Sequence, residues 1–514
     1  MAQEGKQSGP STLQTFKDTV ESLVVAFILA FVFITFVVEA FVIPTGSMAD
    51  TLRGTHFRMV CPTCGYHFNY GFHSTLYGLP EGSVPREAVR IHSSQVNLTG
   101  APMCPMCGTR LETGRERRVA GGDRILVLKF LYQFVDPRPW DVVVFKNPEM
   151  PQQNFIKRLV GLPGQEIEII DGDVYADGRI LRKPGRVQEE LWIDGYLSDY
   201  QPRPGAFDRN GRIWDEPFSP GAESSWEIDH VEREFRFGGS GELEMLNFNP
   251  DRMRQLALSF CPYNGNELDH SSIVSDLGVE FLLTPGGEDT SVTILLSKYG
   301  RVYRADVDFD GEVTITDESR GGQVGWDEYR AGAEPAGKEL ARGKVGALAA
   351  GRATRVRFAL ADHALWASVG GEEIEYLGPD EPEAWGYGSD RRLLPSLALG
   401  ARGGGATLRQ VRVARDVHYT NSAGNERIGR ATEGHPFQLG EDEFLVLGDN
   451  SPQSHDSRFW QVPGLSNGAP YTAGVVPRDY LIGRALFVYW PSGFHIPRFP
   501  LALIPNAGEM RFIN

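Results

Sequence analysis

Ser47 stands in the sequence Pro-Thr-Gly-Ser-Met, a turn signal that carries a hydroxyl group. A serine nucleophile needs an exposed Oγ, a base beside it and N–H donors that can receive an oxyanion. The glycine before Ser47 and the proline three residues before it indicate a sharp, fixed backbone. Taken alone, a serine in such a turn is usually an ordinary loop residue, so this chemistry needs a base from elsewhere in the chain.

Lys157 is a candidate for that base. In the segment Phe-Ile-Lys-Arg-Leu-Val, strand alternation places Phe155, Lys157 and Leu159 on one face. Apolar neighbours would remove water from the lysine, lower its pKa from about 10.4 and make the neutral amine available near neutral pH. The alternative is a lysine that buries its stem and extends its ammonium into water.

A loop at 448–458 is dense in hydroxyl and charged groups. Asp456 and Arg458 could pair and stiffen this loop, and Ser454 could hold a catalytic side chain by a hydrogen bond. The alternatives are a solvated loop or a Ser-His-Asp triad that uses His455. The triad is disfavoured because adjacent histidine and aspartate side chains rarely face each other well enough for that relay.

Four cysteines form two Cys-x-x-Cys pairs with 39 residues between them. Such pairs can supply four thiolates to a tetrahedral zinc ion, and the glycine after each pair fits a tight metal-binding turn. Disulfides and free thiols are the alternatives, and disulfides become a serious rival if this region lies outside the cytoplasm. The expected metal ligands are Cys61, Cys64, Cys104 and Cys107, with His56, His67, His73 and His92 as possible substitutes, whereas Cys261 reads as an ordinary buried residue.

An apolar run precedes the serine turn. Residues 22–43 contain only one charged residue, and as a helix they would measure about 33 Å, enough to cross a bilayer. The sequence therefore predicts a retained transmembrane helix at 22–43 after a flexible tail at 1–21. A cleaved secretory signal is the alternative, but no small-residue cleavage site follows the run. Lysines and arginines flank both ends, so the positive-inside rule does not decide the orientation.

Strands are predicted around the candidate chemical groups. An Asp-Gly pair at 177–178 indicates a tight hairpin turn. The glycine and proline content, 59 and 33 residues, favours β-structure over long helices. The strands are expected at 124–130, 141–145, 155–160, 166–170, 444–447 and 481–490, with the hairpin at 174–179.

The net charge of −16 is concentrated in one block. Residues 185–433 carry 27 Lys/Arg and 42 Asp/Glu, whereas the remainder carries 24 and 25. A shift of this kind indicates a domain boundary. An acidic chain lacks the excess of basic residues that binds nucleic acid, so no nucleic-acid partner is expected. A hydrophobic content of 41% and a charged content of 23% exclude wholesale disorder and a polytopic membrane protein.

Many short β-runs at regular spacing fill the acidic block and predict a β-sandwich at about 205–415. Two segments, RVRFALADHALWASVGGEEI and LALGARGGGATLRQVRVARDV, resemble a concanavalin/laminin-G-like jelly roll. Long insertions in loops cost little entropy, about 0.6 kcal/mol per doubling of length. Removal of 205–415 is therefore expected to leave the chemistry of the remaining chain intact.

Four separated segments together resemble the type I signal peptidases, membrane-anchored Ser/Lys proteases that remove signal peptides. They occur in the family's order and cover about half of the chain. Two departures, Asp50 where proline is usual and Gln165 where aspartate is usual, concern loop shape rather than chemistry. The segments are FVIPTGSMADTL, GDRILVLKF with RPWDVVVFKNP, FIKRLVGLPGQEIEI, and LVLGDNSPQSHDSR followed by LIGRALFVYWP.

The resemblance implies roles for individual residues. Ser47 would be the nucleophile, Lys157 the general base, and Ser454 the serine that orients the lysine. The Thr45 hydroxyl and the N–H of Ser47 would form the oxyanion hole. Asp456, Arg458 and Arg158 would brace the site, and shallow substrate pockets would be lined by Ile43, Pro44, Met48, Leu52, Phe155 and Ile156.

The resemblance also implies the organisation and setting of the protein. The expected fold is mainly β, with one N-terminal transmembrane helix. The signal-peptidase core is expected in two parts, 44–184 and 434–514. A cysteine module at 55–119 is inserted in the first part, and the block 185–433 separates the two. The N-terminus would be cytoplasmic and the catalytic domain outside the cytoplasmic membrane. The expected partners are signal peptides of exported preproteins, the lipid bilayer and the secretion machinery, with no cofactor for catalysis and a structural zinc. A rival hypothesis is an inactive tethered protein whose sandwich binds glycans or envelope proteins.

Overall fold

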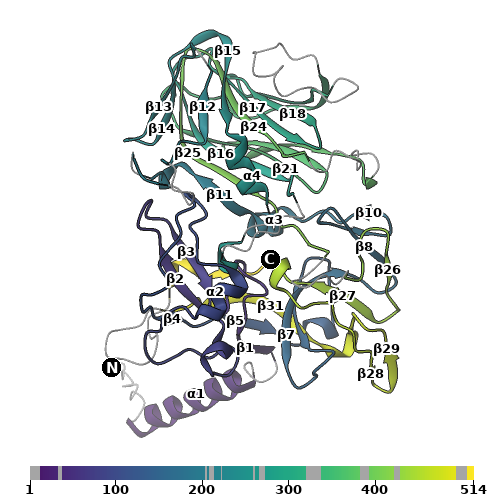
Figure 1. Cartoon of the computed structure of the whole chain (residues 1–514). Coiled ribbons are helices and arrows are strands. Elements are labelled where there is room, and N and C mark those ends of the chain that lie inside the picture. The colour runs from purple at the N-terminus through teal and green to yellow at the C-terminus, as the bar shows by residue number, and fades with distance from the viewer. Residues whose placement is uncertain are drawn as a thin grey trace, which may run out of the picture.

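The computed structural model is mainly β, as the sequence predicts, and its sheets form a lower core and an upper sandwich (Figure 1). The described residues are 12–32, 37–202, 205–207, 213–221, 223–258, 261–265, 273–319, 337–382, 393–421, 429–493 and 506–514.

The central sheet of the core combines strands from both ends of the chain. Ile125, Val127, Val143, Phe145 and Leu159 are almost fully buried, and along β5 the buried residues alternate with more exposed ones, as the two faces of a strand require. In spatial order the strands are β1 (Val38–Val42), β5 (Arg124–Leu128), β31 (Leu481–Trp490), β6 (Val142–Lys146), β7 (Asn154–Gly161), β27 (Glu443–Leu447) and β30 (Val476–Pro477), with β32 (Arg511–Phe512) paired to β31.

A smaller sheet packs beside the central one. The predicted Asp-Gly hairpin is confirmed, since Asp177 and Gly178 both have positive φ angles, 52° and 73°. The strands are β10 (Arg179–Ile180), β9 (Asp173–Ala176), β8 (Glu166–Ile170) and β26 (Phe437–Gln438), and a separate hairpin comprises β28 (Gly464–Ser466) and β29 (Ala469–Tyr471).

The helix predicted at 22–43 is wrong in its extent. Helix α1 spans Thr12–Val32, so it includes half of the predicted flexible tail, and Val38–Val42 forms strand β1 instead. β1 pairs antiparallel with β5, and Glu39 forms an ion pair with Lys129 of the segment that follows β5. The β-branched and aromatic residues of 38–42 suit this pairing. Among the described residues, no helix reaches the length and apolarity expected of a membrane span.

The cysteine module is a small separate layer with its own apolar core. Phe57, Met59, Tyr70 and Val119 are buried there together with the four cysteines of the two pairs. Its elements are β3 (His67–Gly71), β2 (His56–Val60) and β4 (Val119–Ala120), in that spatial order, and α2 (Ser93–Thr99).

The acidic block forms the predicted sandwich, and its two sheets enclose one large apolar core. One sheet is β13 (Trp226–Asp229), β14 (Glu234–Phe237), β25 (Ala406–Arg415), β16 (Leu277–Pro285), β21 (Thr354–Ala361), β22 (Ala364–Val369) and β23 (Glu372–Leu377), with β11 (Ile193–Leu197) beside β25. The other is β12 (Phe218–Pro220), β15 (Ser240–Phe248), β24 (Leu397–Gly403), β17 (Ser291–Lys298), β18 (Arg301–Val307), β19 (Glu312–Asp317) and β20 (Lys338–Lys344).

Buried ion pairs join the sandwich to the core. Lys183, just before helix α3 (Gly185–Leu191), pairs with Asp362 of the β21–β22 turn and, at 2.9 Å, with Asp416. Gln188 Nε2 of α3 donates to the second oxygen of Asp416 at 2.7 Å. These charged groups are removed from water, so loss of either partner would leave an uncompensated buried charge and destabilise the fold. The sandwich is therefore fixed to the core by specific contacts.

Candidate active site

Ser47 and Lys157 meet although 110 positions separate them in the chain. Lys157 Nζ donates a hydrogen bond of 2.6 Å to Ser47 Oγ. Strand β7 presents the lysine from the central sheet, where it lies opposite Val143 of β6. Ser47 lies in the serine loop, which we define as residues 44–52, directly after β1. The strand order β1-β5-β31-β6-β7 of the central sheet thus carries the serine loop and the lysine on one sheet.

The Lys157 side chain is buried, with only 4% of its surface exposed, so a lysine extending into water is excluded. Its Nζ lies 5.5 Å from the centre of the Phe155 ring, on the shared strand face that the sequence predicts. Burial lowers the pKa of Lys157 from 10.5 to about 8, while the Asp456 and Asp449 carboxylates oppose the shift. A substantial fraction of the amine is therefore neutral in mildly alkaline solution.

The loop at 448–458 closes around the serine loop. Asn450 N donates to Ser47 O at 3.1 Å, and Asn450 Nδ2 donates to Gly46 O at 2.8 Å. A Cβ atom on Gly448 would lie 2.5 Å from Ser47 O and 2.2 Å from Ser454 Oγ, so only glycine fits there. Sequence reasoning did not single out Gly448 or Asn450, although the Gly-Asp-Asn turn was the available signal.

Two buried Arg–Asp pairs support this arrangement. Arg458 binds Asp456 through Nε and Nη2 at 2.8 and 2.7 Å, and both side chains are fully buried, as the predicted pairing requires. Burial alone would raise the Asp456 pKa, but the Arg458 guanidinium holds it below its usual value. Arg158 binds Asp449 in the same two-point manner at 2.8 and 2.9 Å, and sequence reasoning had not named this partner.

Replacing Arg458 with methionine is expected to destabilise the protein by about 3–5 kcal/mol, because Asp456 would remain buried without its counter-charge. Urea unfolding monitored by tryptophan fluorescence measures the change. Lys344→Met is the control, since Lys344 pairs with Asp310 in solvent and its loss should leave the midpoint unchanged. Equal midpoints for the two variants would contradict this account of the pair.

Ser454 lies where the loop approaches Lys157, but it does not make the predicted bond. Its Oγ is buried and has no hydrogen-bond partner of ordinary geometry among the described residues. It does lie close enough to Asp456 to favour the ionised carboxylate. The Ser454 hydroxyl is therefore buried beside Asp456 and is not among the residues that line the cavity.

The rival triad is not formed. His455 Nε2 lies 3.0 Å from Glu149 Oε2, and the His455 side chain is 59% exposed. Asp456 turns instead into the interior towards Arg458. His455 is therefore a residue of the cavity rim and not a relay between Asp456 and a serine.

A cavity of about 620 Å³ opens over Ser47 and Lys157. Of the predicted pocket residues, Pro44, Phe155 and Ile156 line it together with Thr45. Ile43, Met48 and Leu52 are not among its lining residues, and their side chains are at most 3% exposed beneath the serine loop. The cavity is also lined by two insertions: Gly71–Thr75 with Glu81 and Gly82 from the cysteine module, and Tyr263 with Asn264 from the acidic block.

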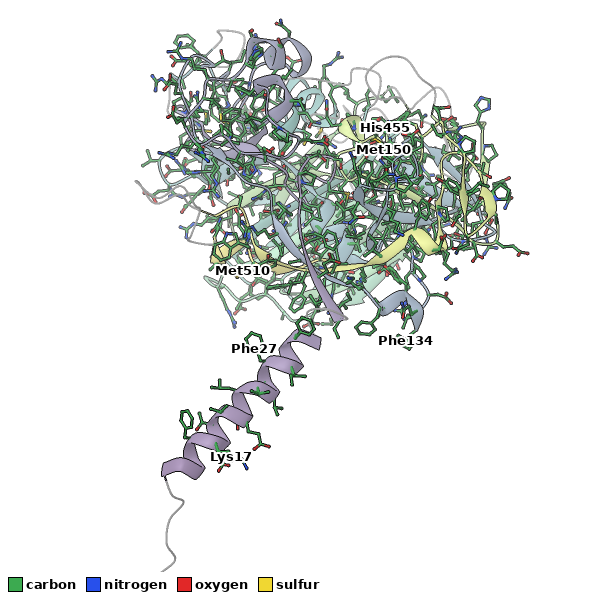
Figure 2. All side chains as sticks on the ribbon, turned by 90° about the horizontal axis from the view of Figure 1, so that it is seen from below. Lys17, Phe27, Phe134, Met150, His455 and Met510 are labelled. Carbon is green, nitrogen blue, oxygen red and sulfur yellow. The ribbon has the colours of Figure 1, made fainter. Side chains whose placement is uncertain are left out.

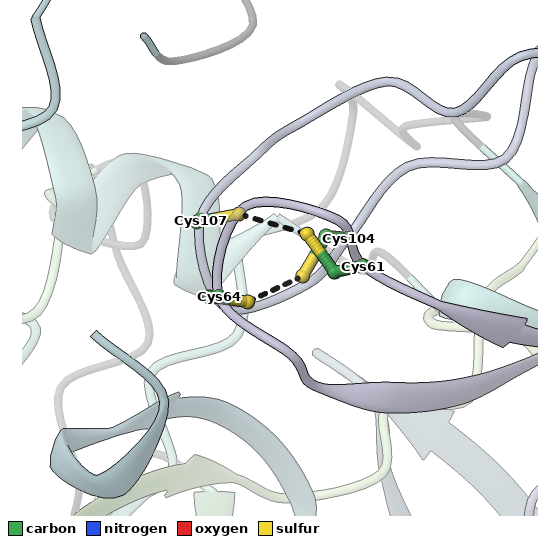
Figure 3. A group of neighbouring side chains, drawn as sticks. All are labelled: Cys61, Cys64, Cys104 and Cys107. Carbon is green, nitrogen blue, oxygen red and sulfur yellow. Dashed lines mark hydrogen bonds between the residues drawn. The ribbon is translucent and has the colours of Figure 1, made fainter. Parts of the chain in front are cut away.

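The four cysteines of the module converge as a candidate metal centre (Figure 3). Their sulfurs all lie within 4.8 Å of one another, and the closest pairs, Cys61 with Cys107 and Cys64 with Cys104, are 3.5 Å apart. Ligands 2.3 Å from a tetrahedral zinc would be about 3.8 Å apart, so the spacing fits such an ion and exceeds a disulfide bond of about 2.05 Å.

The two Cys-x-x-Cys segments form turns of the same backbone conformation. Gly65 and Gly108, with φ of 78° and 72°, each donate an N–H to the first cysteine of their pair at 2.9 Å. The histidines considered as substitutes are outside the group of possible ligands found among the described residues. Cys261 is buried apart from the cluster, as predicted.

Comparison with known proteins matches the family described as "Signal peptidase, peptidase S26" over residues 110–214 and 406–490. These ranges include Lys157 and Ser454, and Ser47 lies before them. The resemblance to the type I signal peptidases is confirmed.

Similar signal peptidases include a probable signal peptidase I-1 of Synechocystis sp. (44% identity; 12% of this chain and 35% of the relative), signal peptidase I of Leptolyngbya laminosa (40%; 12% and 34%) and signal peptidase I V of Bacillus subtilis (36%; 12% and 36%).

The chain thus spans about a third of the length of the signal peptidases that it matches. Among solved structures, similar chains include the carbohydrate-binding module CBM66 from Bacillus subtilis (10% identity, 38% of this chain, 95% of that chain, TM-score 0.24) and sheep galectin-11 in complex with glycerol (13%, 27%, 91%, TM-score 0.19).

Proposed function

We propose that this protein is a membrane-anchored signal peptidase that cleaves signal peptides from exported preproteins with a Ser47–Lys157 dyad. The observation that carries the proposal is the 2.6 Å contact between Lys157 Nζ and Ser47 Oγ at the floor of an open cavity. The buried amine is the base that a serine nucleophile needs. An intact dyad favours a peptidase over an inactive tethered binding protein.

The reaction begins when the neutral Lys157 amine takes the Ser47 hydroxyl proton as Oγ attacks the scissile carbonyl. The N–H of Ser47 and the Thr45 hydroxyl donate to the resulting oxyanion. The Lys157 ammonium then returns its proton to the leaving amine, and the acyl group remains on Ser47 Oγ. A water molecule, deprotonated by the same amine, hydrolyses this ester and restores the serine.

The shape of the cavity supports a substrate of this class. An extended peptide would lie along β7, where the half-buried Phe155 and the edge of the buried Ile156 line the cavity next to Ser47. Such surface suits the small side chains that precede a signal-peptide cleavage site. No cofactor is assigned a part in this mechanism.

Helix α1 supports membrane attachment through its side chains. It projects away from the rest of the molecule, and Figure 2 shows Lys17 and Phe27 along it. Phe16, Leu23, Phe27 and Phe31 are each more than 60% exposed on this helix. Burying such residues in lipid is favourable by roughly 1.5–3 kcal/mol each. We place the N-terminus in the cytoplasm and the cavity outside the cytoplasmic membrane, near the lipid and the secretion machinery.

The zinc assignment belongs to the same proposal. Cys61, Cys64, Cys104 and Cys107 would hold one structural ion as thiolates, and the ion would stabilise the module that supplies Gly71–Thr75 to the cavity. Its contribution is to folding and not to the chemical step.

The test is cleavage of a preprotein by the purified full chain in detergent. Mass spectrometry of the products should show one cut, directly after the signal peptide, and Ser47→Ala protein should produce none. Processing at an equal rate by Ser47→Ala protein would remove the proposed function.

The rate of cleavage is expected to rise with pH. Below the Lys157 pKa of about 8 the amine is protonated and cannot accept the serine proton. Therefore kcat/KM should increase about tenfold per pH unit from pH 6 to 7 and level off above 8. Initial rates in constant ionic strength, with circular dichroism to show that the fold persists, give the profile. A flat profile from pH 6 to 9 would exclude Lys157 as the base.

A further inference from the structure

A short segment of the acidic block, Cys261–Gly265, lies against the serine loop of the core. It follows helix α4 (Pro250–Ala257), which sits on the core-facing side of the sandwich (Figure 1). Pro262–Asn264 forms a single 3₁₀ turn, and Cys261 packs with Tyr263 against Ala49 of the serine loop. The insertion therefore contributes residues to the immediate surroundings of Ser47.

The Tyr263 ring fills the space between the serine loop and the cysteine module. A Cβ atom on Gly46 would lie 2.1 Å from Tyr263 Cε1, and one on Gly71 would lie 2.6 Å from the same atom. Only glycine permits the ring to come this close on both sides. The buried Tyr263 hydroxyl donates to Thr55 O at 2.8 Å, which fixes the ring in place.

Asn264 holds the orientation of Asn450 through a reciprocal amide pair. Each Nδ2 donates to the partner's Oδ1 at 2.7 Å, and both side chains are buried. With its oxygen and one N–H engaged by Asn264, Asn450 directs its second Nδ2 hydrogen to Gly46 O at 2.8 Å. Without Asn264, a buried Asn450 amide would lose two partners and its fixed orientation.

The Gly46 carbonyl matters because it belongs to the same peptide unit as the N–H of Ser47. A peptide unit is planar and trans, so its C=O and N–H point in opposite directions. Fixing the Gly46 oxygen from one side thus aims the Ser47 N–H towards the other side. That N–H is the backbone donor on which the oxyanion depends in the proposed function.

We propose that Tyr263 and Asn264 of the inserted block are positioning residues of the peptidase site, which hold the Gly46–Ser47 peptide so that its N–H faces the reacting carbonyl. This inference rests on the proposed function. It also makes the sandwich part of the catalytic unit, against the expectation that 205–415 can be removed without loss of chemistry. A deletion of that range removes both residues.

The decisive variant is Asn264→Ala in the full chain. We expect kcat for preprotein cleavage to fall about 10- to 100-fold with KM changed less than about twofold, because an oxyanion donor acts in the transition state; complete loss of such a donor costs about 10²–10³-fold. Asn247→Ala, on strand β15 of the sandwich, is the matched control and should retain both constants. An Asn264→Ala enzyme with unchanged kcat would overturn the proposal.

Two further measurements keep the test independent of folding and of the proposed function. If Asn264→Ala does not fold, Asn264→Leu preserves the volume without adding a charge and removes both amide contacts with Asn450, and the same fall in kcat is expected. In Ser47→Cys protein, alkylation of Cys at position 47 by iodoacetamide, followed by mass spectrometry, reports local geometry without peptidase activity. We expect Asn264→Ala to change that rate at least threefold and Asn247→Ala to leave it constant; equal rates would overturn the positioning role even if wild-type protein cleaved nothing.

Discussion

Ser47→Ala and Lys157→Met are each expected to lower kcat/KM for preprotein cleavage by about 10⁴-fold or more, because each removes one half of a group that acts as a unit. Methionine retains the apolar stem of the buried lysine and removes only the amine, so the Lys157 variant should stay folded. Rates measured at high enzyme concentration, with the cleavage position checked by mass spectrometry, give the size of the loss.

The double variant separates a dyad from two independent contributions. Ser47→Ala with Lys157→Met should be no slower than either single variant, since neither residue accelerates cleavage without the other. Losses that multiply would contradict a shared mechanism. The control is Lys146→Met, which removes an exposed lysine from the next strand, β6, and should retain activity.

Loss of the metal is expected to have the largest effect on stability. Structural zinc contributes roughly 10–16 kcal/mol of apparent binding free energy in small modules, and this becomes folding free energy because the site does not exist in the unfolded chain. The double variant Cys61→Ser, Cys64→Ser should therefore lose one zinc per chain and unfold the module. Metal analysis by mass spectrometry and limited proteolysis between β3 and β4 measure the two effects.

The rate of preprotein cleavage should also fall when the cysteine module unfolds, because Gly71–Thr75 line the cavity and Tyr263 packs on Gly71. Cys261→Ser is the matched control and should retain its zinc, since Cys261 is buried away from the cluster. Wild-type protein that contained no metal and a disulfide between any two of the four cysteines would refute the assignment.

Strand positions and the chemical groups on them could be predicted because they depend on local pattern. The alternation of side chains between the two strand faces around Lys157 and the Asp-Gly hairpin at 177–178 are both found in the structure. The end of helix α1 could not be predicted in this way. Residues 38–42 are as apolar as the helix before them, and only the presence of β5, more than 80 positions later, makes them a strand.

The partners of the serine loop were beyond sequence reasoning for the same physical reason. Asn264 belongs to an acidic insertion with its own composition, and nothing in its local sequence indicates a contact with Asn450, 186 positions away. The resemblance to the signal peptidases implies that Met48 and Leu52 line the substrate pocket, but both side chains are fully buried in the core beneath the serine loop.

Strand β31 lies between β5 and β6 in the central sheet, although it follows both of them by more than 300 positions in the sequence. The half of the sheet that carries Ser47 and the half that carries Lys157 are therefore joined only after residue 490 has been synthesised. At about 5–20 residues per second, this comes roughly 15–70 s after Lys157 emerges. The sandwich is continuous in sequence and can fold during that interval, so during biosynthesis it forms before the dyad, and the growing chain keeps its two reactive groups apart until β31 has emerged.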